Sequence, residues 1–324
     1  MASIYITRKI PESGLEMIKK KFGKFDINQE NRVLTKSELI KNVKNRDGIL
    51  CLLTDSIDKE IIDAMGNTCK IISNYAVGFN NIDVEYASKR KKMVTNTPGV
   101  LTDATSDLAI SLLFSCARRI VESDEFTRTG KYKGWDPMLL LGQEVTGKTL
   151  GIIGAGRIGT VVAQKLARGF NMKIIYDDRS NNFDLEKSTN AKRVDLPTLL
   201  KNSDFISVHV SLNKDNHDLL SKKEFNMMKR TCVFINTSRG EVVDEKALVN
   251  ALKEKKIFAA GLDVYESEPR LANGLTRLDN VIIVPHIGSA TVRARTLMAT
   301  MAAQNLIDGL QGKIPKYCVN KDRL

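Results

Sequence analysis

The amino-acid sequence predicts an α/β protein built from two doubly wound parallel-sheet domains. Short apolar strands alternate with amphipathic helices twice along the chain, and a Pro98-Gly99 break with a long helical pattern separates the two alternations. Alternation of this kind is typical of parallel sheets joined by crossover helices. A length of 324 residues also exceeds the usual size of one hydrophobic core, so two domains are expected.

The first alternation covers about the first hundred residues. We expect strands at residues 4–6, 48–53 and 71–73, and helices at residues 13–22, 37–43 and 59–65. The second helix opens with a Ser-x-x-Leu start rather than a full capping box. One helical pattern then runs from Thr102 to about Gly130, and an irregular stretch follows over residues 131–148.

The second alternation begins at Thr149. Helices, among them 158–169 and 245–254, separate six expected strands, at residues 150–153, 173–176, 205–210, 233–236, 259–262 and 281–284. A last amphipathic helix is expected over residues 291–310, followed by a tail. Six strands in one doubly wound sheet are typical of a dinucleotide-binding domain.

Composition and charge exclude several classes of protein. No apolar run approaches the roughly 20 residues that span a bilayer, and the start of the chain lacks signal-peptide features, so we expect a cytoplasmic protein without a membrane partner. Five scattered cysteines without a Cys-x-x-Cys pair predict neither a disulfide framework nor a metal site. The net charge is +12, but the basic runs 19–21 and 89–92 lack interleaved aromatic residues, which favours solvated helix faces over a nucleic-acid partner.

A glycine turn, Gly-x-Gly-x-x-Gly, stands between a predicted strand and a predicted helix. Gly154 allows the tight turn, Gly156 lets backbone approach a pyrophosphate, and Gly159 lets the helix pack closely on the strand. The helix N-terminus then offers unpaired N–H groups to phosphates. In this setting the motif predicts a nicotinamide dinucleotide site, although a simple strand-to-helix turn is the structural alternative.

The residues after the second strand bear on the choice between NAD and NADP. Asp177 follows the first glycine at about the spacing at which an acidic residue accepts hydrogen bonds from the adenosine ribose. Such a carboxylate repels a 2′-phosphate and favours NAD. Arg179, two residues later, would instead attract that phosphate, so NADP stays open.

Three charged residues at predicted strand ends form a candidate catalytic set. His286 ends an apolar strand, at the sheet edge where ligands bind in this architecture. Glu268 follows the preceding strand and would stabilise a protonated histidine, and the planar guanidinium of Arg239 suits a substrate carboxylate. Of the other histidines, His209 is expected to line the cofactor pocket or to be structural, and His217 to be exposed.

Over essentially its whole length the sequence resembles the D-isomer-specific 2-hydroxyacid dehydrogenases, in stretches 74–83, 96–102, 151–159, 236–240, 261–269 and 285–289. The resemblance implies that Arg239, Glu268 and His286 are catalytic and that Val77, Gly78 and Arg239 bind the substrate. It also implies a set of cofactor-binding residues, namely Thr105, Gly154, Gly156, Arg157, Ile158, Gly159, Asp177, Arg179, Thr237, Ser238, Asp263 and Gly288.

The resemblance further implies a flavodoxin-like substrate domain over residues 1–99 and 289–324, a Rossmann NAD-binding domain over residues 100–288, and a homodimer through the latter. Residues 76–79 and 135–137 are most similar to the glyoxylate/hydroxypyruvate reductase branch, which transfers a hydride from NAD(P)H to a small 2-keto acid and gives a D-2-hydroxy acid. That branch often carries an uncharged residue where Asp177 or Asp178 stands, and often prefers NADP. The family as a whole often has Pro at the place of Ser211.

Three alternatives stay open at this point. Two are enzymes, a 3-phosphoglycerate dehydrogenase and a D-lactate-type dehydrogenase. The third is a nucleotide-sensing, corepressor-like binding protein, a class that usually carries additional terminal segments.

Overall fold

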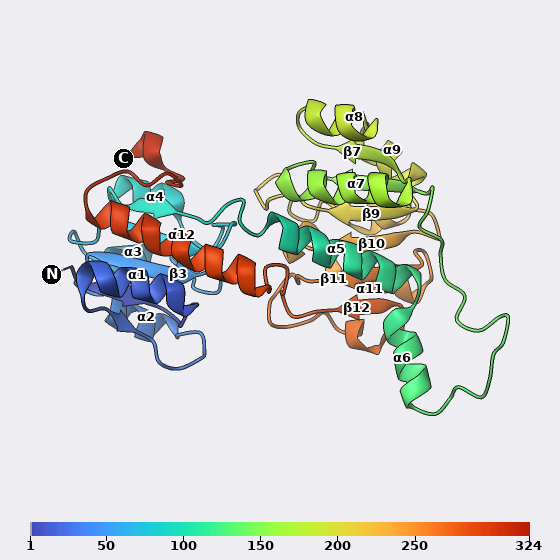
Figure 1. The fold of residues 1–324 in the computed structure, drawn as a ribbon, viewed down its shortest axis with the longest axis horizontal. Coiled ribbons are helices and arrows are strands. Elements are labelled where there is room, and N and C mark those ends of the chain that lie inside the picture. The colour runs from blue at the N-terminus through green and yellow to red at the C-terminus, as the bar shows by residue number, and fades with distance from the viewer. Residues whose placement is uncertain (1) are drawn as a thin grey trace. The chain divides into compact units, whose positions relative to one another are not determined.

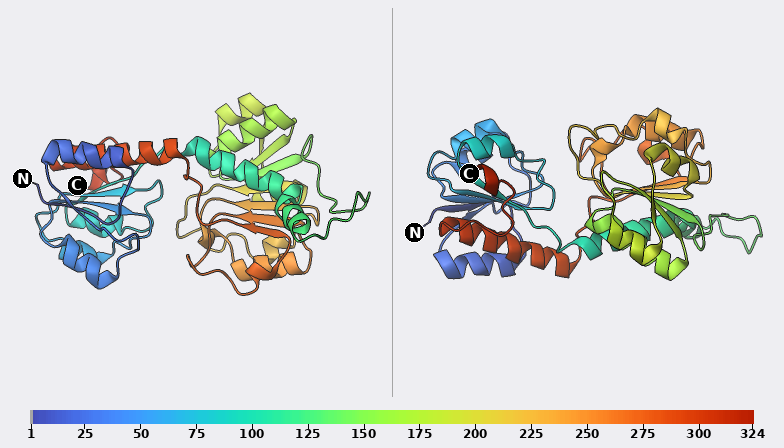
Figure 2. Two further views of the ribbon diagram at one scale, coloured as in Figure 1. Left: turned by 60° about the horizontal axis from the view of Figure 1, so that its bottom comes forward. Right: turned by 90° about the horizontal axis from the view of Figure 1, so that it is seen from above.

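The computed structural model describes residues 2–324 and divides into two compact units (Figure 1). One unit runs to Leu101 and resumes over Ser289–Leu324, and the other is Thr102–Gly288. Each unit is an open, fully parallel sheet with helices on both faces (Figure 2). The predicted fold class, two doubly wound α/β domains, is therefore confirmed.

The unit that holds both chain ends has five strands in the order β2-β1-β3-β4-β5. The strands are β1 (Ile4–Ile6), β2 (Asp26–Ile27), β3 (Gly48–Leu52), β4 (Ile71–Tyr75) and β5 (Met93–Thr95). The helices are α1 (Glu12–Phe22), α2 (Lys36–Val43), α3 (Lys59–Ala64), α4 (Val84–Lys89), α12 (Val292–Leu310) and the short η3 (Lys321–Arg323). Helices α1 and α12 pack together on one face, and α2, α3 and α4 cover the other (Figure 2).

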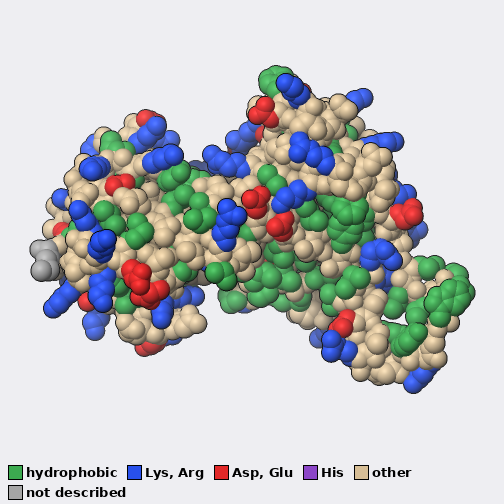
Figure 3. Space-filling view, viewed as in Figure 1, with side chains coloured by type: hydrophobic (Ala, Val, Ile, Leu, Met, Phe, Trp, Pro, Cys, Tyr) green, Lys and Arg blue, Asp and Glu red, His purple; other side chains and the backbone are tan. Residues whose placement is uncertain are grey.

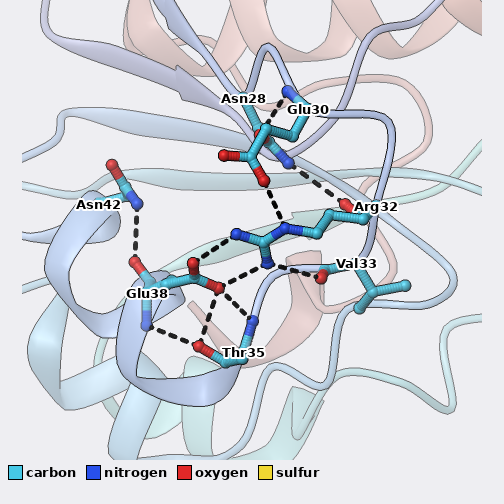
Figure 4. Close-up of polar contacts among 7 residues, drawn as sticks. All are labelled: Asn28, Glu30, Arg32, Val33, Thr35, Glu38 and Asn42. Carbon is cyan, nitrogen blue, oxygen red and sulfur yellow. Dashed lines mark hydrogen bonds and ion pairs between the residues drawn. The ribbon is translucent and has the colours of Figure 1, made fainter.

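The start of α2 corrects the sequence prediction, because a full capping box is present two residues earlier than expected (Figure 4). Thr35 Oγ1 accepts a hydrogen bond from the Glu38 backbone N–H, and Glu38 Oε2 accepts one from the Thr35 N–H at 2.8 Å. The guanidinium of Arg32 also binds both oxygens of Glu38 and holds the pKa of that carboxyl well below its ordinary value. The prediction was wrong because it placed the cap at Ser37.

The second unit has seven strands in the order β12-β11-β10-β9-β6-β7-β8. They are β6 (Thr149–Ile153), β7 (Lys173–Asp177), β8 (Lys192–Arg193), β9 (Phe205–Val208), β10 (Val233–Asn236), β11 (Ala259–Leu262) and β12 (Val281–Ile283). The chain starts at β6 in the middle and proceeds outward in both directions, so β6 and β9 flank the topological switch point. In such sheets ligands bind at the carboxyl ends of the strands beside that point.

Helices cover both faces of this sheet, and a separate hydrophobic core lies on each face. They are α5 (Thr102–Ala117), α6 (Ile120–Arg128), α7 (Arg157–Phe170), α8 (Phe183–Thr189), α9 (Leu196–Asn202), α10 (Lys222–Phe225), α11 (Glu245–Lys253), η1 (Gly240–Val242) and η2 (Leu275–Arg277). No helix among residues 2–324 is both long enough and apolar enough to cross a membrane.

The single helix expected from Thr102 to about Gly130 is wrong, because the chain breaks it into α5 and α6. Arg119, between the two, has a left-handed φ of +52°. The Gln143 N–H donates to the carbonyl oxygen of Ala117 at 2.8 Å, and so takes the acceptor that would continue the helix. The helix therefore ends where the irregular stretch, at Gln143, binds the last residue of α5.

Three short strands, β2, β5 and β8, were missed by the sequence prediction. Each lies at an edge of its sheet and has only two or three residues. Such short segments carry too little alternation of apolar and polar residues to be recognised.

Candidate functional site

The glycine turn joins β6 to α7 at the switch point of the seven-stranded sheet. Gly154 has a φ of +92°, and a Cβ there would lie 2.8 Å from the Val210 backbone nitrogen. A Cβ on Gly159 would lie 2.2 Å from the Gly154 carbonyl oxygen, whereas one on Gly156 would meet no atom within 4 Å. Two glycines are thus needed for packing, and the third leaves open space where a ligand can approach the backbone.

Two buried polar atoms without a hydrogen-bond partner lie at the same edge of the sheet as this turn. They are His209 Nδ1 and Thr237 Oγ1, which follow the neighbouring strands β9 and β10. Burial lowers the pKa of His209 to about 3, so its ring is neutral, and its Nε2 lies 2.8 Å from Ser207 Oγ. Buried polar atoms are normally hydrogen-bonded, so this edge fits a polar ligand such as a dinucleotide.

The two aspartates after β7, Asp177 and Asp178, have different contacts, which the sequence did not predict. Asp178 Oδ2 accepts the Ala155 N–H of the glycine turn at 2.8 Å, and its Oδ1 accepts the Arg179 N–H at 2.7 Å. The half-buried Asp177 makes no such contact with the turn, although its carbonyl oxygen accepts the Gly154 N–H. Burial raises the pKa of Asp177, and the charge of Arg193 opposes that rise.

Arg193, on the edge strand β8, is a residue that the sequence prediction missed. Its Nε and Nη2 donate to the carbonyl oxygens of Asp178 and Arg179, each at 2.9 Å. It therefore holds the loop at the predicted ribose position. No sequence motif marks this residue, because it stands in a two-residue strand. Arg157, at the start of α7, is exposed.

His286 and Glu268 form a pair at the carboxyl ends of β12 and β11. His286 Nδ1 lies 2.9 Å from Glu268 Oε2, and Glu268 Oε1 accepts the Tyr265 backbone N–H at 3.1 Å. Burial raises the pKa of Glu268, but the hydrogen bond and charge of His286 outweigh it, so this pKa lies below its ordinary value. The carboxylate is therefore ionised at neutral pH.

Arg239 follows β10 in a turn that is held by Asn236. The Asn236 side chain accepts from the Ser238 N–H at 3.0 Å and donates to the Arg239 carbonyl oxygen at 3.0 Å. Burial lowers the pKa of Arg239, and the negative charges of Glu241 and Glu268 oppose this shift. Arg239 and Glu268 are thus close enough to interact electrostatically.

Three predicted cofactor residues are tied to the loop after His286. Asp263 Oδ1 accepts the Ile287 N–H at 2.6 Å, and its Oδ2 accepts the Gly288 N–H at 2.7 Å. Thr105 Oγ1 donates to the Gly288 carbonyl oxygen at 3.0 Å. These bonds stabilise the left-handed φ of +54° at His286 and so fix the direction of its side chain.

Val77 and Gly78 lie in the other unit, in the loop after β4. The Ala76 carbonyl oxygen accepts the Thr97 N–H at 2.8 Å, and the Val77 carbonyl oxygen accepts Asn96 Nδ2 at 2.7 Å. Because the N–H and C=O of a trans peptide point in opposite directions, the N–H groups of Val77 and Gly78 point away from these partners.

The remaining histidine, His217, is exposed, with Nδ1 3.0 Å from Asp218. Residues 2–324 contain no group of acidic, His or Cys side chains suited to hold a metal ion. The sheet order, the glycine turn and the unpartnered polar atoms together define a dinucleotide-binding α/β protein.

Comparison with known proteins identifies the family. Residues 110–288 match the family model described as the NAD binding domain of D-isomer specific 2-hydroxyacid dehydrogenases. The chain is 49% identical over 325 residues to a glyoxylate reductase of Thermococcus litoralis, covering 99% of this chain and 97% of the relative. This protein therefore belongs to the D-isomer-specific 2-hydroxyacid dehydrogenase family and is an NAD(P)-dependent oxidoreductase.

Solved structures agree with this assignment. A glyoxylate reductase from Paecilomyes thermophila superimposes with a TM-score of 0.88 at 30% identity, covering 99% of each chain. An NADPH-dependent glyoxylate/hydroxypyruvate reductase from Sinorhizobium meliloti, solved with NADP and malonate, has a TM-score of 0.85 at 28% identity, covering 98% of this chain and 96% of that one.

Proposed function

We propose that this protein reduces a small 2-keto acid of the glyoxylate/hydroxypyruvate type to the D-2-hydroxy acid. The observation that carries the proposal is the His286–Glu268 pair at 2.9 Å, on the same sheet edge as the glycine turn. The similarity to reductases of glyoxylate and hydroxypyruvate supports the choice of substrate.

In the mechanism that we propose, the bound nicotinamide supplies a hydride to the keto carbon. His286 donates a proton to the keto oxygen from Nε2, since Nδ1 is engaged by Glu268. Arg239 binds the substrate carboxylate and orients it, and the N–H groups of Val77 and Gly78 are proposed to contact the same carboxylate. The ionised Glu268 stabilises the positive charge of the imidazolium before the transfer.

We propose residues 102–288 as the dinucleotide-binding domain and the unit of both chain ends as the substrate domain. The phosphates would lie at Gly156 and the start of α7, with Arg157 and Ile158 beside them. His209 Nδ1 and Thr237 Oγ1 would find their hydrogen-bond partners on the cofactor. Asp178 binds the glycine turn, whereas the carboxylate of Asp177 does not. The Asp177 carboxylate is thus available to the adenosine ribose, which favours NAD.

We also propose that the chain forms a homodimer through the dinucleotide-binding unit. Hydrophobic side chains are exposed on α6 and on the loop that follows it (Figure 3). Among them, Trp135 is 84% exposed. The others are Ile120, Val121, Tyr132, Met138 and Leu141. Exposed hydrophobic side chains gathered on one segment are typical of a protein interface. Light scattering should give twice the chain mass, and a monomer at micromolar concentration would refute the dimer.

The direct test is a substrate panel. We expect the highest kcat/KM for glyoxylate or hydroxypyruvate, with D-glycerate as the product from hydroxypyruvate. Pyruvate, phosphohydroxypyruvate and both reduced cofactors are measured in parallel, and a His286→Gln preparation controls for contaminating reductases. A preference for phosphohydroxypyruvate or pyruvate would overturn the substrate choice. Binding of NADH without turnover of any keto acid would favour the corepressor-like alternative.

A further inference from the structure

A buried carboxylate, that of Glu245, contacts the segment that carries Glu268. Glu245, the first residue of α11, is only 5% exposed. Its Oε1 accepts the Glu266 backbone N–H at 3.0 Å, and the Ala272 backbone N–H faces the same carboxylate and lowers its pKa. One side chain thus binds the start of segment 266–272 and lies beside its end.

The turn that carries Arg239 also packs against the chain just before this segment, at Tyr265. A Cβ on Gly240 would lie only 1.8 Å from the Tyr265 carbonyl carbon, so the two backbones are in direct contact. The Tyr265 hydroxyl donates to the Val284 carbonyl oxygen at 2.8 Å, two residues before His286. Glu268 therefore lies in a segment that is fixed by α11, by η1 and by the strand leading to His286.

The environment of Glu245 is unfavourable for a negative charge. Burial raises the pKa of Glu245, and the nearby carboxylates of Glu266 and Glu268 raise it further, while the two backbone N–H groups lower it. A buried carboxylate beside other carboxylates costs free energy. The charged groups around Glu268 are Asp263, Arg239, Glu245 and His286.

We propose that Glu245 is a positioning residue for the reduction. By binding the Glu266 N–H at the start of segment 266–272, it keeps the Glu268 carboxylate aimed at His286 Nδ1, and its negative charge lies close to that of Glu268. This inference rests on the proposed function, in which that pair delivers the proton. Glu245 itself touches neither substrate nor cofactor.

The test compares Glu245→Gln and Glu245→Ala with the wild type. Glutamine keeps one acceptor, whereas alanine removes both. We expect kcat to fall by about tenfold or more, with an unchanged Kd for NADH, because the proton donor is misplaced. The alkaline limb of the kcat/KM profile should move to lower pH by about half a unit, since a negative charge is lost near the pair.

The matched control is Glu224→Gln. Glu224 also lies in the first turn of a helix of this unit, and its Oε2 accepts the Ser221 N–H at 3.1 Å, but it has no contact with segment 266–272. This variant should keep the wild-type kcat and pH profile. In a Glu268→Gln background, Glu245→Gln should cost less than about twofold, because it acts through Glu268.

A wild-type pH profile in Glu245→Gln, or a full additional loss in the Glu268→Gln background, would overturn the proposal. So would failure of both Glu245→Gln and Glu245→Ala to fold, since Glu245 would then be structural. A readout without turnover separates this proposal from the proposed function. With ¹⁵N-labelled histidine, Glu245→Gln should shift the ring signals of His286 and leave those of His209 unchanged, whichever substrate the enzyme uses.

Discussion

His286 Nδ1 lies 2.9 Å from Glu268 Oε2, although the two residues come from different strand ends of the sheet. A carboxylate in this position fixes the direction of the imidazole ring and reserves its Nε2 for the substrate. Because the pKa of Glu268 lies below its ordinary value, its carboxylate stays negatively charged into the acid range.

The first prediction concerns this pair. His286→Gln should lower kcat by about 10² to 10⁴-fold, since general acid catalysis by a positioned side chain is lost, while NADH binding stays intact. Glu268→Gln should lower kcat less and move the alkaline limb of the pH profile to lower pH. Steady-state kinetics and fluorescence titration of NADH check both variants, and near-normal turnover by His286→Gln would remove it from the mechanism.

Arg239→Lys tests whether the guanidinium geometry matters as well as the charge. Lysine cannot bind a carboxylate through two parallel hydrogen bonds, so kcat/KM for the keto acid should fall by about 10 to 100-fold. The Kd for NADH should change little. The result that contradicts the assignment is an unchanged kcat/KM for every keto acid of the panel.

Gly156→Ala tests the cofactor site without disturbing the fold. A Cβ at this position meets no protein atom within 4 Å, so the variant should unfold at the wild-type temperature. Its Kd for NADH should still rise by at least about tenfold, because the methyl group would occupy space needed by the pyrophosphate. Gly169→Ala is the matched control, since its Cβ also meets nothing within 4 Å, and it should bind NADH normally.

The two adjacent aspartates should respond differently to substitution. Asp177→Ala should raise the kcat/KM ratio of NADPH to NADH by about tenfold, since a carboxylate facing the 2′-phosphate is removed. Asp178→Ala should weaken both cofactors together, because the Ala155 N–H of the glycine turn loses its partner. Parallel titration with both cofactors checks this contrast, and the reverse pattern would exchange the two roles.

Buried His209 predicts a pH dependence of stability. Its native pKa is about 3, whereas in the unfolded chain it is close to 6.5, so below pH 6.5 the unfolded state binds the additional proton. The free energy of unfolding should therefore fall as the pH drops from 6.5 toward 3, by about 2 kcal/mol between pH 7 and pH 5. Urea unfolding of His209→Asn should show a correspondingly smaller loss. The exposed His217→Asn should behave as the wild type does.

Much of the candidate site was accessible from sequence because its residues stand next to local patterns. The glycine turn lies between a strand and a helix, and Arg239, Glu268 and His286 each follow an apolar strand. In a parallel sheet the carboxyl ends of all strands meet at one edge, so position along the chain predicts proximity in space. Position along the chain does not predict the distance between His286 and Glu268 or the backbone conformation of His286.

By itself the sequence determined the two doubly wound sheets, the dinucleotide turn and the three charged strand ends, because apolar periodicity and glycine spacing are local properties. Only the tertiary structure decided where α5 ends, which aspartate supports the glycine turn, and that Glu245 lies beneath Glu268. Each of these depends on a hydrogen bond between residues more than 20 positions apart. Such a bond leaves no periodic signal in the chain, since either partner alone looks like an ordinary surface residue.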